Sequence, residues 1–216
     1  MPHQYMRVAS YNALPLVQEA DKRFEQQLAS AGLSRDEFFA QLAPLFLDAG
    51  VAGQYAACLV HRHYLLMDGE RMVTRGSSSR PASVDDSPNI VADSWLPTGE
   101  AFEYRYTTEP AIATPPPKLF FDRFRSIMDK YRIDTVGICS APDVTNLAPD
   151  FVLLERPGSH DREQVTNIVP RSSLIGNSTA VEAIWVAEQD SQGLAKIFQS
   201  LQSLPIFAIL VLSWLV

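Results

Sequence analysis

The chain has 216 residues, of which 46% are apolar and 20% are charged, as is ordinary for a globular protein with a substantial core. Its net charge of −7, with no basic block, excludes a nucleic-acid binder and disfavours an anionic membrane surface, because phosphate contacts need clustered lysine and arginine. Two cysteines without CxxC spacing indicate neither a disulfide framework nor a zinc ribbon, and the lack of an apolar N-terminal run predicts a cytoplasmic protein.

Two helices are predicted first. Residues 16–31 carry apolar side chains at helical spacing, and Gly32 follows them as a natural C-terminal stop. Residues 34–37, Ser-Arg-Asp-Glu, have the spacing of a capping box that opens a second helix reaching Phe46, which Pro44 must kink or divide. We expect these helices to pack on a sheet; a groove for a partner is the alternative.

The stretch Ala56–Val73 holds two of the four histidines. Its apolar first half and a following Asp-Gly pair predict two strands joined by a tight turn. Because strand side chains alternate, His61 and His63 would share a face roughly 6 to 7 Å apart, so both could reach one divalent metal ion. General acid–base catalysis by these two histidines is a second interpretation, and a purely structural histidine pair is a third.

This stretch resembles the first motif of the cupin β-barrel proteins, a glycine followed by His-x-His, a glutamate and another glycine. Here the motif reads Gly53, His61-Arg62-His63, Glu70 and Gly76, with spacers that differ from those of the family. The resemblance implies that Glu70 is a metal ligand beside the histidines. In its general sequence character the chain also resembles uncharacterised small proteins of filamentous fungi, some of which are encoded beside specialised-metabolite genes.

The middle of the chain predicts a loop and a second hairpin. Residues 76–89 are polar and of low complexity, which indicates a flexible surface loop. Residues 90–106 predict two strands around a Pro-Thr-Gly turn. Phe102, Tyr104 and Tyr106 share one face of the second strand, where they either pack in the core or form the floor of a ligand pocket.

The second half predicts an amphipathic helix over 118–132, a short strand ending at Cys139, and three further strands, 151–155, 165–169 and 180–188. Cys139 lies where a nucleophile with a histidine base could act, although a lone buried cysteine usually serves as a small apolar residue. His160 lies in an exposed turn, and it becomes a further metal ligand if that turn folds over His61 and His63.

The last 13 residues, Leu204–Val216, carry no charge and are fewer than the roughly 20 apolar residues that a spanning helix needs. They are interpreted as a buried terminal element, as the product of a misjudged gene end, or as a short tail anchor that would associate the protein with a membrane. We therefore predict a single domain over 1–203 followed by an apolar tail of uncertain status.

The order of elements predicts an α+β fold with two N-terminal helices, two β-hairpins, one amphipathic helix and further mainly antiparallel strands. The first functional hypothesis is a small intracellular protein that binds or modifies a small organic molecule, in specialised-metabolite biosynthesis, with His61 and His63 as catalytic residues or ligands of a divalent metal. The alternative is a non-catalytic accessory protein that binds a pathway enzyme and has structural histidines.

Overall fold

The computed structural model describes residues 6–83, 89–109, 115–141, 148, 150–174, 180–189, 195–197 and 209–212. Its α-helices are α1 (Val8–Asn12), α2 (Val17–Ala31), α3 (Arg35–Asp48) and α4 (Lys118–Tyr131), with a short 3-10 helix at Arg171–Leu174. None of the helices in this described part combines the length and the apolar character needed to cross a lipid bilayer. Together with the strands they confirm the predicted α+β class.

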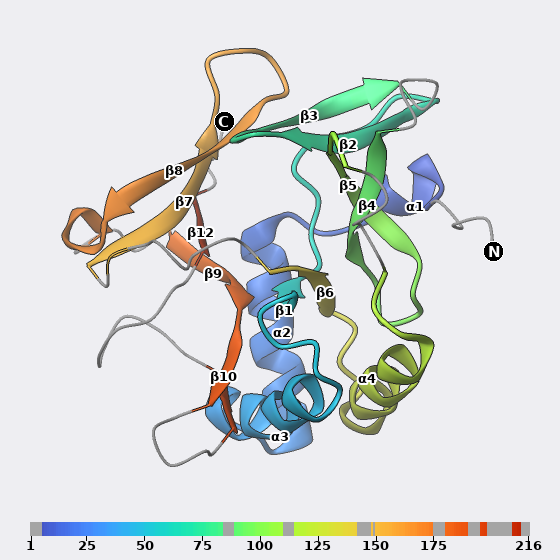
Figure 1. Cartoon of the computed structure of the whole chain (residues 1–216), viewed down its shortest axis with the longest axis vertical. Helices are drawn as coiled ribbons and strands as arrows, with labels where there is room; N and C mark the ends of the chain where they lie inside the picture. Colours follow the sequence, from blue (N-terminus) through green and yellow to red (C-terminus); the bar gives the residue numbers. More distant parts are fainter. Residues whose placement is uncertain are drawn as a thin grey trace.

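Most of the strands form one closed barrel, in the order β1-β6-β4-β5-β2-β3-β8-β7-β12-β9. Adjacent strands are antiparallel except in the pairs β2–β5 and β7–β12. In Figure 1 the strands surround the centre of the view, and α2, α3 and α4 gather at its lower side. The strands are β1 (Tyr55–Leu59), β2 (Glu70–Arg75), β3 (Ser78–Ser83), β4 (Ile90–Trp95), β5 (Ala101–Tyr106), β6 (Val136–Ser140), β7 (Phe151–Pro157), β8 (Gln164–Pro170), β9 (Ala180–Trp185) and β12 (Ile209–Leu212), with β10 (Ala187–Gln189) and β11 (Ala195–Ile197) in a separate pair.

Local sequence signals account for the helix ends. Gly32 terminates α2 with a φ of +70°, a conformation that glycine adopts without steric cost. At the start of α3, the Ser34 hydroxyl accepts a hydrogen bond from the Glu37 backbone and the Glu37 carboxylate accepts one from the Ser34 backbone, as the capping box predicts. The helix continues through Pro44 as one element to Asp48.

The main core lies between the helices and one side of the barrel. It is largely aromatic, and the Phe39 ring packs 4.7 Å from the Trp185 ring, centroid to centroid. All five residues of β1 are buried, because its two faces contact different cores. One face, with Ala57 and Leu59, packs against the helical core, while Cys58 belongs to a second cluster with Tyr11. A strand buried on both faces explains the continuous apolar sequence.

The predicted hairpin over Ala56–Val73 is wrong in its pairing. Gly69 makes the expected turn with a φ of +81°, but β1 pairs with β6 and β9, while β2 pairs with β3 and β5. Strand β1 ends at Leu59, so the two histidines lie in the irregular connection that follows it. The apolar pattern marked a buried segment correctly, but it carried no information about the strand's partners.

Three other segments were predicted from the sequence: the polar loop 76–89, the hairpin 90–106 and the apolar tail 204–216. Ser78–Ser83, expected in a flexible loop, is strand β3 paired with β2 across a tight turn, and residues 84–88 of that loop lie outside the described residues. The hairpin of β4 and β5 forms as predicted. In the apolar tail, Ile209–Leu212 forms strand β12 between β7 and β9, and the rest of Leu204–Val216 lies outside the described residues.

Candidate metal centre

The histidine-bearing connection, residues 60–67, is held by the segment around α1 rather than by a partner strand. The Arg62 N–H donates to the Pro15 carbonyl at 2.9 Å. The Asn12 side chain bonds Leu66 twice, donating to its carbonyl at 2.9 Å and accepting from its N–H at 2.8 Å. Backbone groups that would otherwise be unpaired outside the sheet are thereby satisfied, which fixes the path of the connection.

His61 offers a nitrogen with a free lone pair. Its Nδ1 lies 2.8 Å from the Leu59 carbonyl oxygen, and because a carbonyl can only accept, Nδ1 carries the proton. Nε2 of His61 is buried and has no hydrogen-bond partner among the described residues. Burial, with the neighbouring His63, lowers the pKa of His61 to about 4, so the ring is neutral at pH 7. A neutral imidazole with one oriented N–H is the form that binds metals.

His63 lies beside His61, with ring centroids 4.8 Å apart, and it pairs with Glu103 of β5. Its Nε2 is 3.2 Å from a Glu103 carboxylate oxygen. Burial opposes the charge of His63, but Glu103 and then Glu155 outweigh it and raise the pKa of His63 to about 9. Burial likewise opposes the charge of Glu103, yet His63 lowers the net pKa of that carboxyl. Without a metal, His63 and Glu103 therefore form a buried ion pair.

Glu155 of β7 completes the group. One ligand atom from each of His61, His63 and Glu155 lies within 4.8 Å of the others, a spacing that a single cation between them would bridge. Burial raises the pKa of the Glu155 carboxyl, although its charge is favoured by His63. A positive ion would relieve that burial cost, because an opposite charge stabilises the carboxylate.

Tyr11 of α1 connects this group to the N-terminal segment. Its hydroxyl donates to the Glu103 carboxylate and accepts from the His63 N–H at 3.3 Å. Tyr11 is 1% exposed, and burial raises the pKa of its hydroxyl well above the usual range, so the phenol stays protonated. Tyr11 and Glu103 thus fix both the backbone and the ring of His63.

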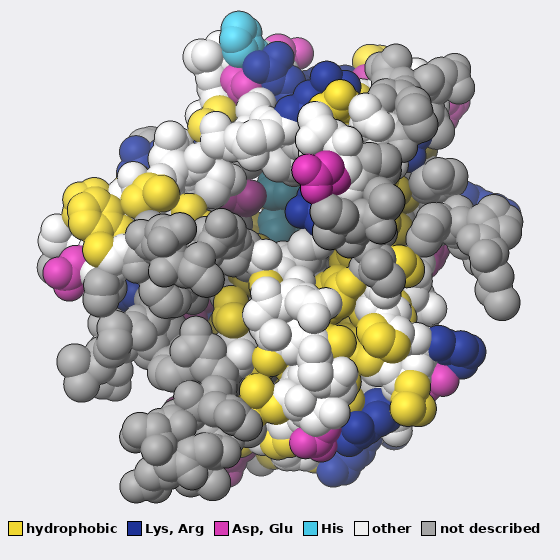
Figure 2. Space-filling model, viewed as in Figure 1, with side chains coloured by type: hydrophobic (Ala, Val, Ile, Leu, Met, Phe, Trp, Pro, Cys, Tyr) yellow, Lys and Arg dark blue, Asp and Glu magenta, His cyan; other side chains and the backbone are white. Residues whose placement is uncertain are grey.

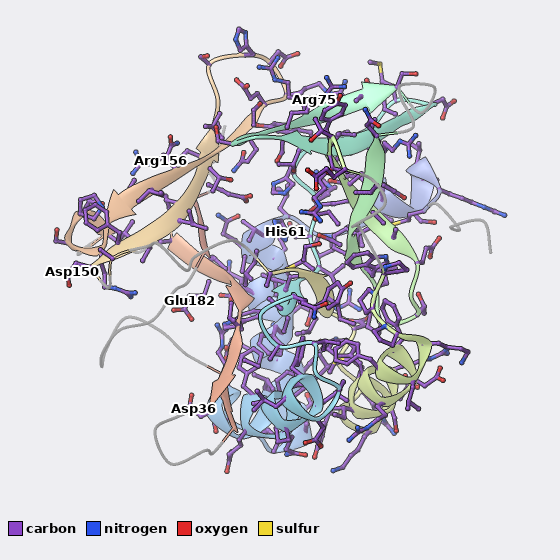
Figure 3. All side chains as sticks on the ribbon, viewed as in Figure 1. Asp36, His61, Arg75, Asp150, Arg156 and Glu182 are labelled. Atoms are coloured by element: carbon purple, nitrogen blue, oxygen red, sulfur yellow. The ribbon has the colours of Figure 1, made fainter. Side chains whose placement is uncertain are left out.

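A cavity of about 50 Å³ lies against these residues, with Glu103, Glu155 and both histidines in its wall. Figure 3 places His61 at the centre of the ring of strands. Figure 2 shows histidine side chains deep in an opening near the middle of the same face, with acidic and basic side chains at its edge. The group therefore lies inside the barrel beside a small, partly open cavity.

Two sequence-predicted ligands do not join this group. Glu70 instead binds Arg162, with 2.6 Å between carboxylate oxygen and guanidinium nitrogen, because the turn at the start of β2 faces the β7–β8 connection. His160 is exposed in that connection, where its backbone N–H donates to the Glu163 carboxylate at 3.2 Å. Glu155, rather than Glu70 or His160, is the third metal-ligating type of side chain beside His61 and His63.

Cys139 does not have the properties of a nucleophile. A hydrogen bond with Cys58 and burial raise the pKa of its thiol well above the usual value, whereas a nucleophilic cysteine needs a lowered pKa. Both cysteines are buried and free, and both line the cavity. They serve as small apolar residues in its wall.

Glu155 and Glu103 were not among the site residues predicted from the sequence. Glu103 alternates with the aromatic residues Phe102 and Tyr104, which predicts a solvent-facing side chain, and neither glutamate has a sequence neighbour that signals a metal site. Two imidazoles and one carboxylate, with a second carboxylate in contact with one imidazole, are a set that proteins use for zinc and for non-haem iron(II). The chain matches no protein-family model, no curated protein and no solved structure.

Proposed function

We propose that the protein binds a divalent transition-metal ion through His61, His63 and Glu155 and uses it to act on a small organic molecule. The observation that carries this proposal is the buried, unpartnered Nε2 of neutral His61 beside two further donors within 4.8 Å. An unsatisfied buried polar atom is costly, and a bound ion would remove that cost. Glu103 would orient the His63 ring through its contact with the ring nitrogen Nε2.

When bound, the ion would supply Lewis-acid character or activate a water molecule. Three protein donors leave further coordination positions for such ligands, as in catalytic rather than structural sites. We further propose a cytoplasmic location, from the two cysteines that lack a disulfide pattern, and a role in specialised metabolism, from the general resemblance to small fungal proteins.

One observation favours the alternative, a partner-binding protein with structural histidines. His63 and Glu103 already neutralise each other at 3.2 Å, so this half of the group needs no metal to be stable. Under this alternative the unpartnered nitrogen of His61 has no role, and the protein would bind a pathway enzyme without an ion.

Metal content decides between the two functions. We would purify the full chain without a histidine tag, incubate it with iron(II), zinc, cobalt(II) or manganese(II), and measure metal per chain by elemental analysis after desalting. We expect about one ion per chain, lost in His61→Ala and in Glu155→Gln. His160→Ala and Glu70→Gln serve as matched controls that keep the ion. Folded wild-type protein that retains none of these metals would refute the proposed function and favour the structural alternative.

A further inference from the structure

The cavity beside the donor group limits what can reach a bound ion. Its volume is about 50 Å³, whereas an engineered cavity of about 150 Å³ holds one benzene ring. The space therefore suits a ligand of about two or three non-hydrogen atoms. Organic substrates normally occupy pockets of about 300 Å³ or more, so such a substrate would have to lie outside this space.

The charges around the donor group limit the ligand further. The two carboxylates beside the histidines, Glu103 and Glu155, supply two negative charges, which match a divalent ion. Asp93, which interacts electrostatically with Glu103, pairs with Arg105 at 3.2 Å, so these two side chains together add no net charge. An anionic ligand would then place an uncompensated charge in a buried site, which costs free energy. A neutral ligand would avoid that cost.

The remainder of the cavity wall is mostly apolar and includes Leu59, Phe102, Ala183 and Ile184. Its one further hydroxyl, that of Ser94, is hydrogen-bonded to Glu103. Apolar walls favour ligands that need few hydrogen bonds. We infer that the ion at His61, His63 and Glu155 accepts, on its open side, a neutral ligand of two or three non-hydrogen atoms, the size of dioxygen, and discriminates against anions and rings. This inference rests on the proposed function and identifies the class of co-substrate at that site.

The test uses the full chain loaded with a saturating amount of iron(II) without oxygen. Nitric oxide serves as the neutral diatomic probe, because its complex with iron(II) gives a characteristic electron paramagnetic resonance signal. Azide, of similar size but negatively charged, and imidazole, a neutral five-membered ring, compete with it. Glu103→Gln removes one of the two balancing charges with little change in shape, and Glu70→Gln makes the same chemical change away from the site. Phe102→Ala enlarges the cavity.

We expect wild-type protein to bind nitric oxide at about one per iron and to resist competition by azide and imidazole. Displacing nitric oxide from Glu103→Gln should take at least tenfold less azide than displacing it from wild type, whereas Glu70→Gln should need the same amount of azide as wild type. Imidazole should displace nitric oxide only from Phe102→Ala. The inference would be overturned if iron-loaded wild type failed to bind nitric oxide, or if its affinity for azide equalled that of Glu103→Gln. Either result would leave the proposed metal site intact. Failure to load iron or any other metal would refute the proposed function itself, and this inference with it.

Discussion

Raising the pH should destabilise the metal-free protein through His63. The pKa of this imidazole is raised from 6.5 to about 9, chiefly by Glu103 against the effect of burial. A raised pKa means that the folded state binds the proton more tightly than the unfolded state, so the stabilisation is complete below pH 6.5 and is lost as the pH rises through 9. At 1.36 kcal/mol per pKa unit, the loss is about 3 kcal/mol.

The free energy of unfolding, measured by urea titration at pH 6.5 and pH 9.5 in the presence of a chelator, checks this value. The matched variant is His63→Gln, which keeps a polar side chain but cannot take up the proton. Wild type should lose about 3 kcal/mol more than His63→Gln over this interval. Equal losses in the two proteins would show that His63 is not a buried imidazolium, and the charge assignment of the centre would fail.

Three further changes test the surroundings of the site. Glu103→Gln should weaken metal binding roughly 10- to 100-fold, measured by competition with a chromophoric chelator, because Glu103 orients His63; unchanged affinity would exclude that role. Asn12→Ala should lower the free energy of unfolding by about 1 to 3 kcal/mol, because it breaks both bonds to Leu66, and an unaltered urea midpoint would contradict this. Gly137→Ala should cost about 1 to 3 kcal/mol by the same assay, since its Cβ would lie 2.6 Å from the Trp95 carbonyl oxygen, and full stability would show that the strands separate easily.

The helix ends and the second hairpin could be predicted from the sequence, because the residues that determine them are close together in the chain. The capping box at Ser34, the stop at Gly32 and the hairpin of residues 90–106 all appear in the structure. Each depends on residues a few positions apart, whose preferences act whatever the rest of the chain does. The adjacency of His61 and His63 is of the same kind, and it survives although the strand expected to present them ends at Leu59.

The third donor could not be predicted, because it depends on barrel closure. Glu155 comes from β7, which reaches the histidines only because ten strands close in an order far from their order in the sequence. Periodicity states which face a residue occupies in its strand, but not whether that face looks into a barrel or into water. Glu70, by contrast, is near His63 in sequence yet binds Arg162.

The ion pair of His63 and Glu103 is compatible with metal binding, because a proton and a metal ion would compete for the same imidazole. If the ion binds His63, it must displace that proton, so metal affinity should rise about tenfold per pH unit from roughly 6.5 to 9, the range in which the metal-free protein loses stability. Calorimetric titration with zinc in buffers of different ionisation enthalpy would count the released protons. Release of close to one proton per bound ion below pH 9, and loss of that release in His63→Gln, would place the metal on His63. Binding whose affinity does not depend on pH would place the metal elsewhere.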